Sequence, residues 1–87
     1  MSGRLQGRVA IVTGAGRGFG RAIALAFGDE GADVVVNYHA SAEAAAEVVQ
    51  ALEKLGRRAI ALKADVARDD DVKSMIDFVL KLEPGVP

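Results

Sequence analysis

A glycine-rich stretch from Thr13 to Gly20 carries the residue types that bind phosphate groups. Four apolar residues, Val9 to Val12, precede it, and strong helix formers follow it over residues 21–27. A loop that joins a buried strand to the start of a helix directs the free N–H groups of that helix toward an anion. Glycine is needed there where a side chain would keep the backbone from a pyrophosphate, or where φ is positive. The stretch predicts a phosphate-binding loop, and an ordinary glycine-rich turn is the alternative.

The spacing of the glycines narrows the type of loop. A G-x-G-x-x-G fingerprint starting at Gly14 would need a third glycine at position 19, which is Phe19. A P-loop would need Gly-Lys-Ser/Thr, and the first lysine of the chain is Lys54. The pattern that fits is Thr-Gly-x-x-x-Gly-x-Gly, which resembles the loop of the short-chain dehydrogenase/reductase family. The resemblance implies that the loop contacts a dinucleotide cofactor through Gly14, Ala15, Gly16, Arg17, Gly18, Phe19 and Gly20.

The residues at the end of the second strand bear on the choice of cofactor. An acid that holds the adenosine ribose usually stands about twenty residues past the loop, but Asn37, Tyr38 and His39 occupy these positions. A carboxylate there would favour NAD and repel a 2′-phosphate, whereas Arg17 can pair with that phosphate. NADP-preferring members of the family often carry a basic residue at the position of Arg17. We therefore expect NADP in preference to NAD, with Asn37, His39 and Ser41 as further donors; unselective NAD binding is the alternative.

Asp65 and Val66 follow the third predicted strand. In the family that Thr13–Gly20 resembles, an acidic residue and its neighbour hold the adenine at this point. The carboxylate can accept a hydrogen bond from the adenine amino group while the next backbone N–H faces a ring nitrogen. Alternatively, Asp65 caps the turn before the third helix. Tyr38 and His39 either stack near the adenine or border the loop, and the sequence does not decide between these positions.

Strands and helices alternate along the chain. Apolar periodicity and turn residues predict strands at 8–12, 33–38 and 58–64, and helices at 17–29, 42–55 and 71–82. This pattern predicts an α/β fold with a three-stranded parallel sheet of order 3-2-1, which is half of a doubly wound Rossmann fold. The side chains expected to be buried on the first two helices are Phe19, Ile23, Ala26, Phe27, Ala45, Val48, Leu52 and Leu55; on the third they are Val72, Met75, Ile76 and Val79. Gly28 is expected to mark close packing on the sheet, and Gly31 and Gly56 to end helices.

Composition limits the other functions. The 87 residues suit one small domain, and 51% of them are hydrophobic. There is no cysteine and one histidine, so neither a disulfide nor a histidine cluster for a metal is expected. The net charge of −1 argues against general nucleic-acid binding. No signal segment and no membrane-spanning run is visible, and we expect a cytoplasmic protein.

The resemblance covers the chain up to about Leu82 and is closest to the 3-oxoacyl-(acyl carrier protein) reductase branch. The segments VTGAGRGFGRAIA, VVVNYHAS and ADV stand where that branch has their counterparts. The catalytic Ser and Tyr-x-x-x-Lys of the family have no match, because the only tyrosine, Tyr38, is followed four residues later by Ala42. We therefore interpret the chain as the N-terminal dinucleotide-binding part of an NADP-dependent oxidoreductase that transfers hydride to a carbonyl, without catalytic residues and inactive alone.

Two other functions fit parts of the sequence. The chain could be an interaction module that pairs with another copy, or with a relative, through the free edge of its first strand. It could also bind FAD or S-adenosylmethionine, although Arg17 and the absence of an acid at Asn37 count against that.

Overall fold

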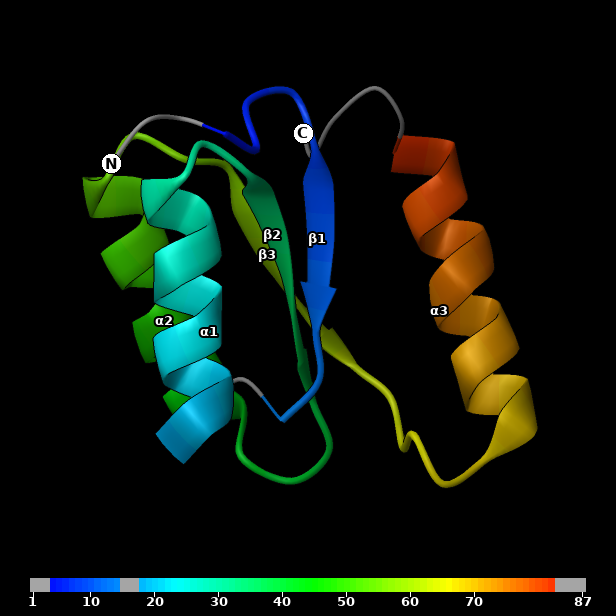
Figure 1. Ribbon diagram of the computed structural model, residues 1–87. Coiled ribbons are helices and arrows are strands. Elements are labelled where there is room, and N and C mark those ends of the chain that lie inside the picture. Colours follow the sequence, from blue (N-terminus) through cyan, green and yellow to red (C-terminus); the bar gives the residue numbers. More distant parts are fainter. Residues whose placement is uncertain (1–3, 15–17, 83–87) are drawn as a thin grey trace.

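The computed structural model describes residues 4–14 and 18–82, without the side chain of Leu82. Its elements are β1 (Val9–Val12), α1 (Gly18–Asp29), β2 (Asp33–Tyr38), α2 (Ala42–Lys54), β3 (Ala59–Lys63) and α3 (Asp69–Leu82). The strands form one parallel sheet in the order β1-β2-β3. Figure 1 shows α1 and α2 on one face of this sheet and α3 on the other. The predicted half of a Rossmann fold, with strand order 3-2-1, is confirmed.

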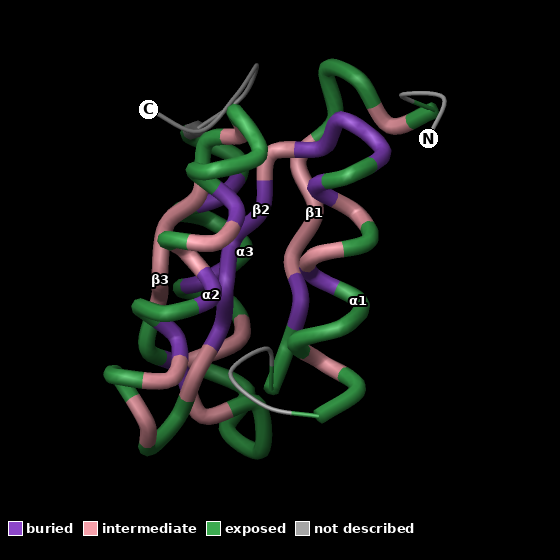
Figure 2. Tube along the Cα trace, turned by 90° about the vertical axis from the view of Figure 1, so that its left-hand side faces the viewer, coloured by how far each residue is buried: buried purple, intermediate pink, exposed green. Residues whose placement is uncertain are grey.

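The central strand β2 explains why both faces of the sheet are covered. Val34, Val35 and Val36 are fully buried, and successive side chains of a strand point to opposite faces. Val34 and Val36 pack in the cluster under α1 and α2, whereas Val35 packs with Val79 of α3. Figure 2 shows β2 as the most continuously buried part of the trace. A continuous apolar strand is therefore needed at this position.

The buried face of α1 differs from the prediction. Ala24 and Gly28 are its buried residues, while Phe19 is 87% exposed and Ile23 45% exposed. The helix is apolar on most of its circumference, so periodicity alone could not identify the face that packs. The small residues let the backbone of α1 approach its neighbours closely. A Cβ at Gly28 would collide with the side chain of Leu52, so Gly28 marks close packing against α2 and not against the sheet.

The other two helices follow the prediction more closely. Helix α2 buries Ala45, Val48 and Leu52, but it ends at Lys54, which leaves Leu55 outside it and 43% exposed. Helix α3 buries Met75 and Val79 and leaves Ile76 41% exposed.

Helix α3 begins two residues earlier than predicted, at Asp69. Three aspartates then fall in its first turn, where the helix dipole favours negative charge. Asp69 and Asp70, which precede the predicted start, thus belong to the first turn of the helix.

The segment before β1 is held against the end of α1. The Glu30 carboxylate accepts hydrogen bonds from the backbone N–H of Arg4 at 3.2 Å and from its Nε and Nη2 at 3.1 and 3.0 Å. The Leu5 N–H donates to the Glu30 carbonyl at 2.8 Å. The hydrogen bond to Glu30, and then the attraction between the charges, raises the pKa of the Arg4 guanidinium. These contacts fix where the chain enters the sheet.

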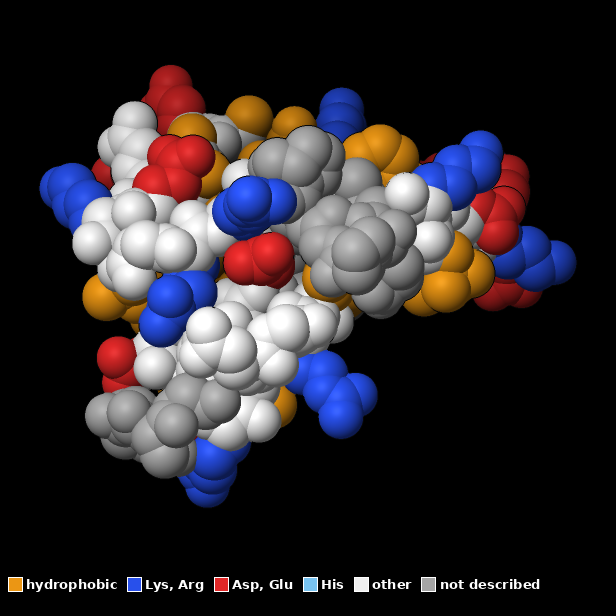
Figure 3. All heavy atoms as spheres, turned by 90° about the horizontal axis from the view of Figure 1, so that it is seen from above, with side chains coloured by type: hydrophobic (Ala, Val, Ile, Leu, Met, Phe, Trp, Pro, Cys, Tyr) orange, Lys and Arg blue, Asp and Glu red, His pale blue; other side chains and the backbone are white. Residues whose placement is uncertain are grey.

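The end of the molecule that carries the Arg4–Glu30 pair has mixed charge. Viewed from this end, basic side chains are spread around the outline, with acidic groups between them (Figure 3). No single region of one sign dominates this view.

Candidate functional site

The predicted site residues that the structure describes gather at the carboxyl edge of the sheet. Because the strands are parallel, the segments after β1, β2 and β3 leave the sheet at the same edge, at the lower end in Figure 1. These segments carry Gly14, the stretch from His39 to Ser41, and Asp65 with Val66. The amino end of α1 lies at this edge as well, so its free N–H groups face the same region.

The glycines that flank the loop adopt a backbone conformation that suits no other residue well. Gly14 has φ of 62° and Gly18 has φ of 56°. A Cβ built at either position meets no atom of residues 4–14 and 18–82 within 4 Å. The conformation, and not crowding within the chain, therefore requires glycine here. Within the described part of the chain nothing keeps a pyrophosphate from these two backbones, so both residues fit a dinucleotide.

Three predicted loop residues, Ala15, Gly16 and Arg17, lie outside the described residues. Of the others, Gly18, Phe19 and Gly20 form the first turn of α1, which contains no acidic residue. An anion at this helix end would therefore meet no carboxylate of the first turn.

The side-chain amide of Asn37 is buried and hydrogen-bonded within the fold. The residue is 2% exposed, and its Nδ2 donates to the carbonyl oxygens of Leu62 and Ala64, both at 3.2 Å. An amide nitrogen carries two hydrogens, so both are used. Asn37 thus ties the end of β2 to the end of β3, and both hydrogens of its side-chain amide are used within the fold and not offered to a ribose or its phosphate.

Asp65 performs the turn-capping role that was the alternative in the sequence. Its Oδ1 accepts from the Ala67 N–H at 2.9 Å, and its own N–H donates to Oδ2 of Asp71 at 2.9 Å. Its Oδ2 lies 3.7 Å from Nε2 of His39, which brings the loops after β2 and β3 together. Val66 is 52% exposed. Contact of Asp65 and Val66 with an adenine stays a prediction.

Ser41 is the N-cap of α2. Its Oγ accepts from the Ala44 N–H at 3.4 Å. Its contact with the cofactor stays a prediction.

Two interactions at this edge could not be predicted from the sequence. One is the hydrogen bond from the Asn37 amide to the Leu62 carbonyl of β3, and the other is the approach of His39 to Asp65. Each joins residues about 25 apart in the chain. The register that places Asn37 opposite Leu62 creates the first. Only a prediction of strand register could have found it.

Two further observations concern the described residues alone. Within residues 4–14 and 18–82, no three acidic or histidine side chains come close enough together to hold a metal ion. Among the helices of this part, none combines the length and the apolar character needed to cross a membrane.

Comparisons with known proteins agree on one family. The sequence model of the short chain dehydrogenase family matches residues 8–85 of this chain. A trihydroxynaphthalene reductase of Pestalotiopsis fici is 49% identical over 81 residues, which are 93% of this chain and 29% of that protein.

Two solved structures extend the comparison. A short chain dehydrogenase from Burkholderia cenocepacia, in complex with NADP, superposes with a TM-score of 0.85 at 50% identity, over 90% of this chain and 32% of that one. A 7α-hydroxysteroid dehydrogenase complexed with NADH and a 7-oxo bile acid superposes with a TM-score of 0.84 at 39% identity, over 92% of this chain and 31% of that one.

The chain thus spans about a third of the length of each of these proteins. The family match nevertheless runs through nearly all of the present sequence, from the start of β1 to beyond the end of α3. This chain belongs to the short-chain dehydrogenase family.

Proposed function

We propose that this chain is the adenosine-side, dinucleotide-binding part of an NADP-dependent oxidoreductase that reduces a carbonyl. The observation that carries the proposal is the pair of positive-φ glycines, Gly14 and Gly18, between the end of β1 and the start of α1. The reductase relative from Pestalotiopsis fici supports the direction of the reaction. When bound, the reduced cofactor supplies the hydride for this chemistry.

Each part of the cofactor has an assigned partner in this proposal. The backbone from Gly14 to Gly20 holds the pyrophosphate against the amino end of α1. Arg17 pairs with the 2′-phosphate, and Ser41 lies near it. Asp65 and Val66 border the adenine. Asn37 acts indirectly, because its amide holds the end of β3, and with it Asp65, in place.

The preference for NADP rests on charge. The two similar structures hold NADP in one case and NADH in the other, so the fold alone does not select the cofactor. Residues 37–39 contain no carboxylate that would repel a 2′-phosphate, and Arg17 supplies a guanidinium. We expect no hydride transfer by this chain alone, because its sequence lacks the Tyr-x-x-x-Lys pair.

Isothermal titration calorimetry with 2′,5′-ADP and, separately, with 5′-ADP tests the proposal. A hydrogen-bonded charge pair contributes about 1.5–3 kcal/mol, so we expect 2′,5′-ADP to bind about ten to a hundred times more tightly. Arg17→Ala should abolish this preference and leave 5′-ADP binding unchanged. Arg8→Ala is the matched control, because Arg8 is exposed at the opposite end of β1. Equal affinities for the two nucleotides, or no binding of either, would refute the proposal.

A second candidate function is pairing through β1. Among the described residues, β1 pairs only with β2, so its other edge is free. The strand Val9–Val12 contains no charged residue or proline to discourage pairing, whereas β3 ends in Lys63. Self-association without any nucleotide binding would favour this function over the first.

A further inference from the structure

The peptide unit between Ala64 and Asp65, where β3 gives way to the turn before α3, is held at both ends. Its carbonyl oxygen, on Ala64, accepts from Nδ2 of Asn37 at 3.2 Å, and its N–H, on Asp65, donates to Oδ2 of Asp71 at 2.9 Å. Asn37 belongs to β2 and Asp71 to the first turn of α3. Because a peptide unit is planar, contacts at its two ends fix its orientation.

The Asp65 side chain is fixed by the turn that follows it. Its Oδ1 accepts from the Ala67 N–H at 2.9 Å, and the Asp65 carbonyl accepts from the Arg68 N–H at 2.9 Å. Its Oδ2 accepts no hydrogen bond from the described part of the chain and lies 3.7 Å from Nε2 of His39. The side chain is 30% exposed, so a ligand at the carboxyl edge can reach the carboxylate.

Asp71 differs from the two other acids in its turn. Asp69 and Asp70 are exposed, and Oδ2 of Asp70 lies 3.4 Å from Nη2 of Arg68. Asp71 is partly buried and reaches back six residues to the end of β3. All three charges suit the amino end of a helix. The helix dipole therefore does not explain why one of the three carboxylates is directed at the Asp65 N–H.

This arrangement leaves one acceptor at a defined place on the carboxyl edge. A carboxylate oxygen accepts hydrogen bonds and donates none, so Oδ2 of Asp65 suits an amino group of a ligand. Adenine carries such a group on its ring, and a purine without it would leave the carboxylate unsatisfied. The orientation of this oxygen follows from that of the peptide unit before it, and hence from Asp71.

We propose that Asp71 is a positioning residue for the nucleobase. By holding the Asp65 N–H it orients Oδ2 of Asp65 toward the exocyclic amino group of adenine, so that the chain selects adenine over a purine without this group. The inference rests on the proposed function, because it needs a nucleotide at the carboxyl edge. Helix α3, on the face of the sheet opposite α1 and α2 (Figure 1), thus acts on the site through the turn that precedes it.

Calorimetric titration with 5′-ADP and with purine riboside 5′-diphosphate, which lacks only the exocyclic amino group, measures the base selectivity. A hydrogen bond to a charged group that is partly exposed contributes about a factor of ten in affinity, so we expect the unmodified chain to prefer 5′-ADP about tenfold. Asp71→Ala should reduce this preference to less than about threefold and leave the affinity for purine riboside diphosphate unchanged. Asp70→Ala, which removes the same charge from the same turn, is the matched control and should keep the preference.

Two conservative variants separate positioning from folding. Asp71→Asn retains an oxygen that can accept from the Asp65 N–H, so it should keep most of the preference. Asp71→Glu keeps the charge in the first turn but moves the carboxylate by one methylene, so it should lose much of the preference. If Asp71→Ala loses its far-UV circular dichroism, Asp71→Glu takes its place. Hydrogen exchange of the Asp65 amide should be slow in the unmodified chain and in Asp71→Asn, and faster in Asp71→Ala and Asp71→Glu.

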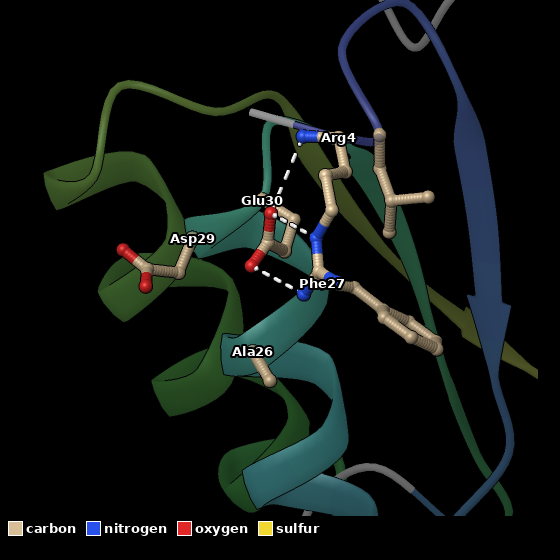
Figure 4. Close-up of a pocket in the computed structure, with 6 residues that line it drawn as sticks. Arg4, Ala26, Phe27, Asp29 and Glu30 are labelled. Carbon is tan, nitrogen blue, oxygen red and sulfur yellow. Dashed lines mark hydrogen bonds and ion pairs between the residues drawn. The ribbon is translucent and has the colours of Figure 1, made fainter. Parts of the chain in front are cut away.

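Another hollow in the described part of the chain tests where the base binds. Leu5, Ala26 and Phe27 line an apolar hollow of about 530 Å³ at the opposite end of the sheet, with the Arg4–Glu30 pair at its margin (Figure 4). Ala26→Leu fills part of this hollow. A preference for 5′-ADP that survives Ala26→Leu supports binding at the carboxyl edge. A preference that Ala26→Leu abolishes belongs to the hollow and overturns the proposal.

The remaining outcomes separate this inference from the proposed function. If 5′-ADP does not bind, both are overturned. If 5′-ADP binds no more tightly than purine riboside diphosphate, or if Asp71→Ala keeps the preference, only the inference is overturned. An equal loss of affinity for both nucleotides in Asp71→Ala also overturns it, because Asp71 would then support the fold alone. The same holds if Asp70→Ala loses the preference as well, because the charge of the turn would then be the cause.

Discussion

Replacing Asn37 tests whether this residue holds the fold or holds the cofactor. Its side chain lies at the end of β2, is 2% exposed, and donates to the carbonyls of Leu62 and Ala64. Asn37→Ala removes both hydrogen bonds, so the carbonyl oxygens of Leu62 and Ala64 each lose a donor in the protein interior. The sequence had assigned Asn37 to the cofactor, so the two roles make different predictions.

The structure gives the size of the effect. A neutral hydrogen bond contributes about 1 kcal/mol net, and an acceptor left buried without its donor costs somewhat more, so the two together amount to about 2–3 kcal/mol. A domain of this size loses about 4–8 °C in Tm for each kcal/mol. We therefore expect Asn37→Ala to lower the Tm by about 10–20 °C, which is a large part of the stability of so small a domain.

Asn37→Asp adds a pH dependence with a definite sign. The new carboxylate would be buried against two carbonyl oxygens, which raises its pKa above the ordinary value of about 3.9. A group whose pKa is higher in the folded state contributes stability at low pH and loses it as the pH rises through the folded pKa. Asn37→Asp should therefore be at least as unstable as Asn37→Ala at pH 7 and should partly recover near pH 4.

Urea denaturation followed by far-UV circular dichroism measures both variants at pH 4 and 7. Gln50→Ala is the control, because it removes an exposed amide from α2 and should change stability by less than about 0.5 kcal/mol. The reasoning fails if Asn37→Ala is as stable as the control. If that variant keeps its stability but loses affinity for 2′,5′-ADP, Asn37 contacts the cofactor directly, as the sequence first indicated.

Three further substitutions test local structure by the same denaturation assay. Gly31 has φ of 103°, and a Cβ there would lie 3.1 Å from the backbone of Gln6, so Gly31→Ala should cost about 2–3 kcal/mol. Gly56→Ala, with φ of 81° and no atom near the new Cβ, should cost only about 1 kcal/mol, and equal losses would exclude the contact with Gln6 as the cause. Ser41→Ala removes the N-cap of α2 and should cost about 0.5–1 kcal/mol, whereas no loss would show that the 3.4 Å contact with Ala44 is not a stabilising cap.

The order and type of the elements could be predicted because several local signals agree. The apolar run Val34–Val36, the N-cap at Ser41 and the positive-φ glycines at 31 and 56 each act within a few residues. Such signals locate strands and helix ends before any tertiary contact is known. The parallel order then follows, since strands that alternate with helices form right-handed crossovers.

The buried face of α1 could not be predicted in the same way. Its sequence, GFGRAIALAFGD, has apolar residues on most sides, so the stripe through Phe19 and Ile23 looks as buried as the one through Ala24. What decides between them is how closely the helix approaches its neighbours. Gly28 fits under Leu52 only because it has no Cβ, and this contact turns Ala24 inward and Phe19 outward.

In the candidate site, too, features set by local backbone conformation could be predicted, whereas those set by tertiary contacts could not. The need for glycine at positions 14 and 18 could be predicted from the sequence, because it resides in the backbone conformation of these residues themselves. Asn37 and Asp65 are polar side chains whose partners lie across the sheet or in the next turn, and their hydrogen bonds depend on register. A polar residue at the carboxyl edge of a parallel sheet can serve a ligand only if the fold leaves its hydrogen bonds free. At this edge the fold uses both hydrogens of Asn37 and one oxygen of Asp65. Of the residues assigned to the 2′-phosphate from the sequence, Asn37 is therefore the one whose side-chain donors are already used, and our proposal assigns the selectivity to Arg17.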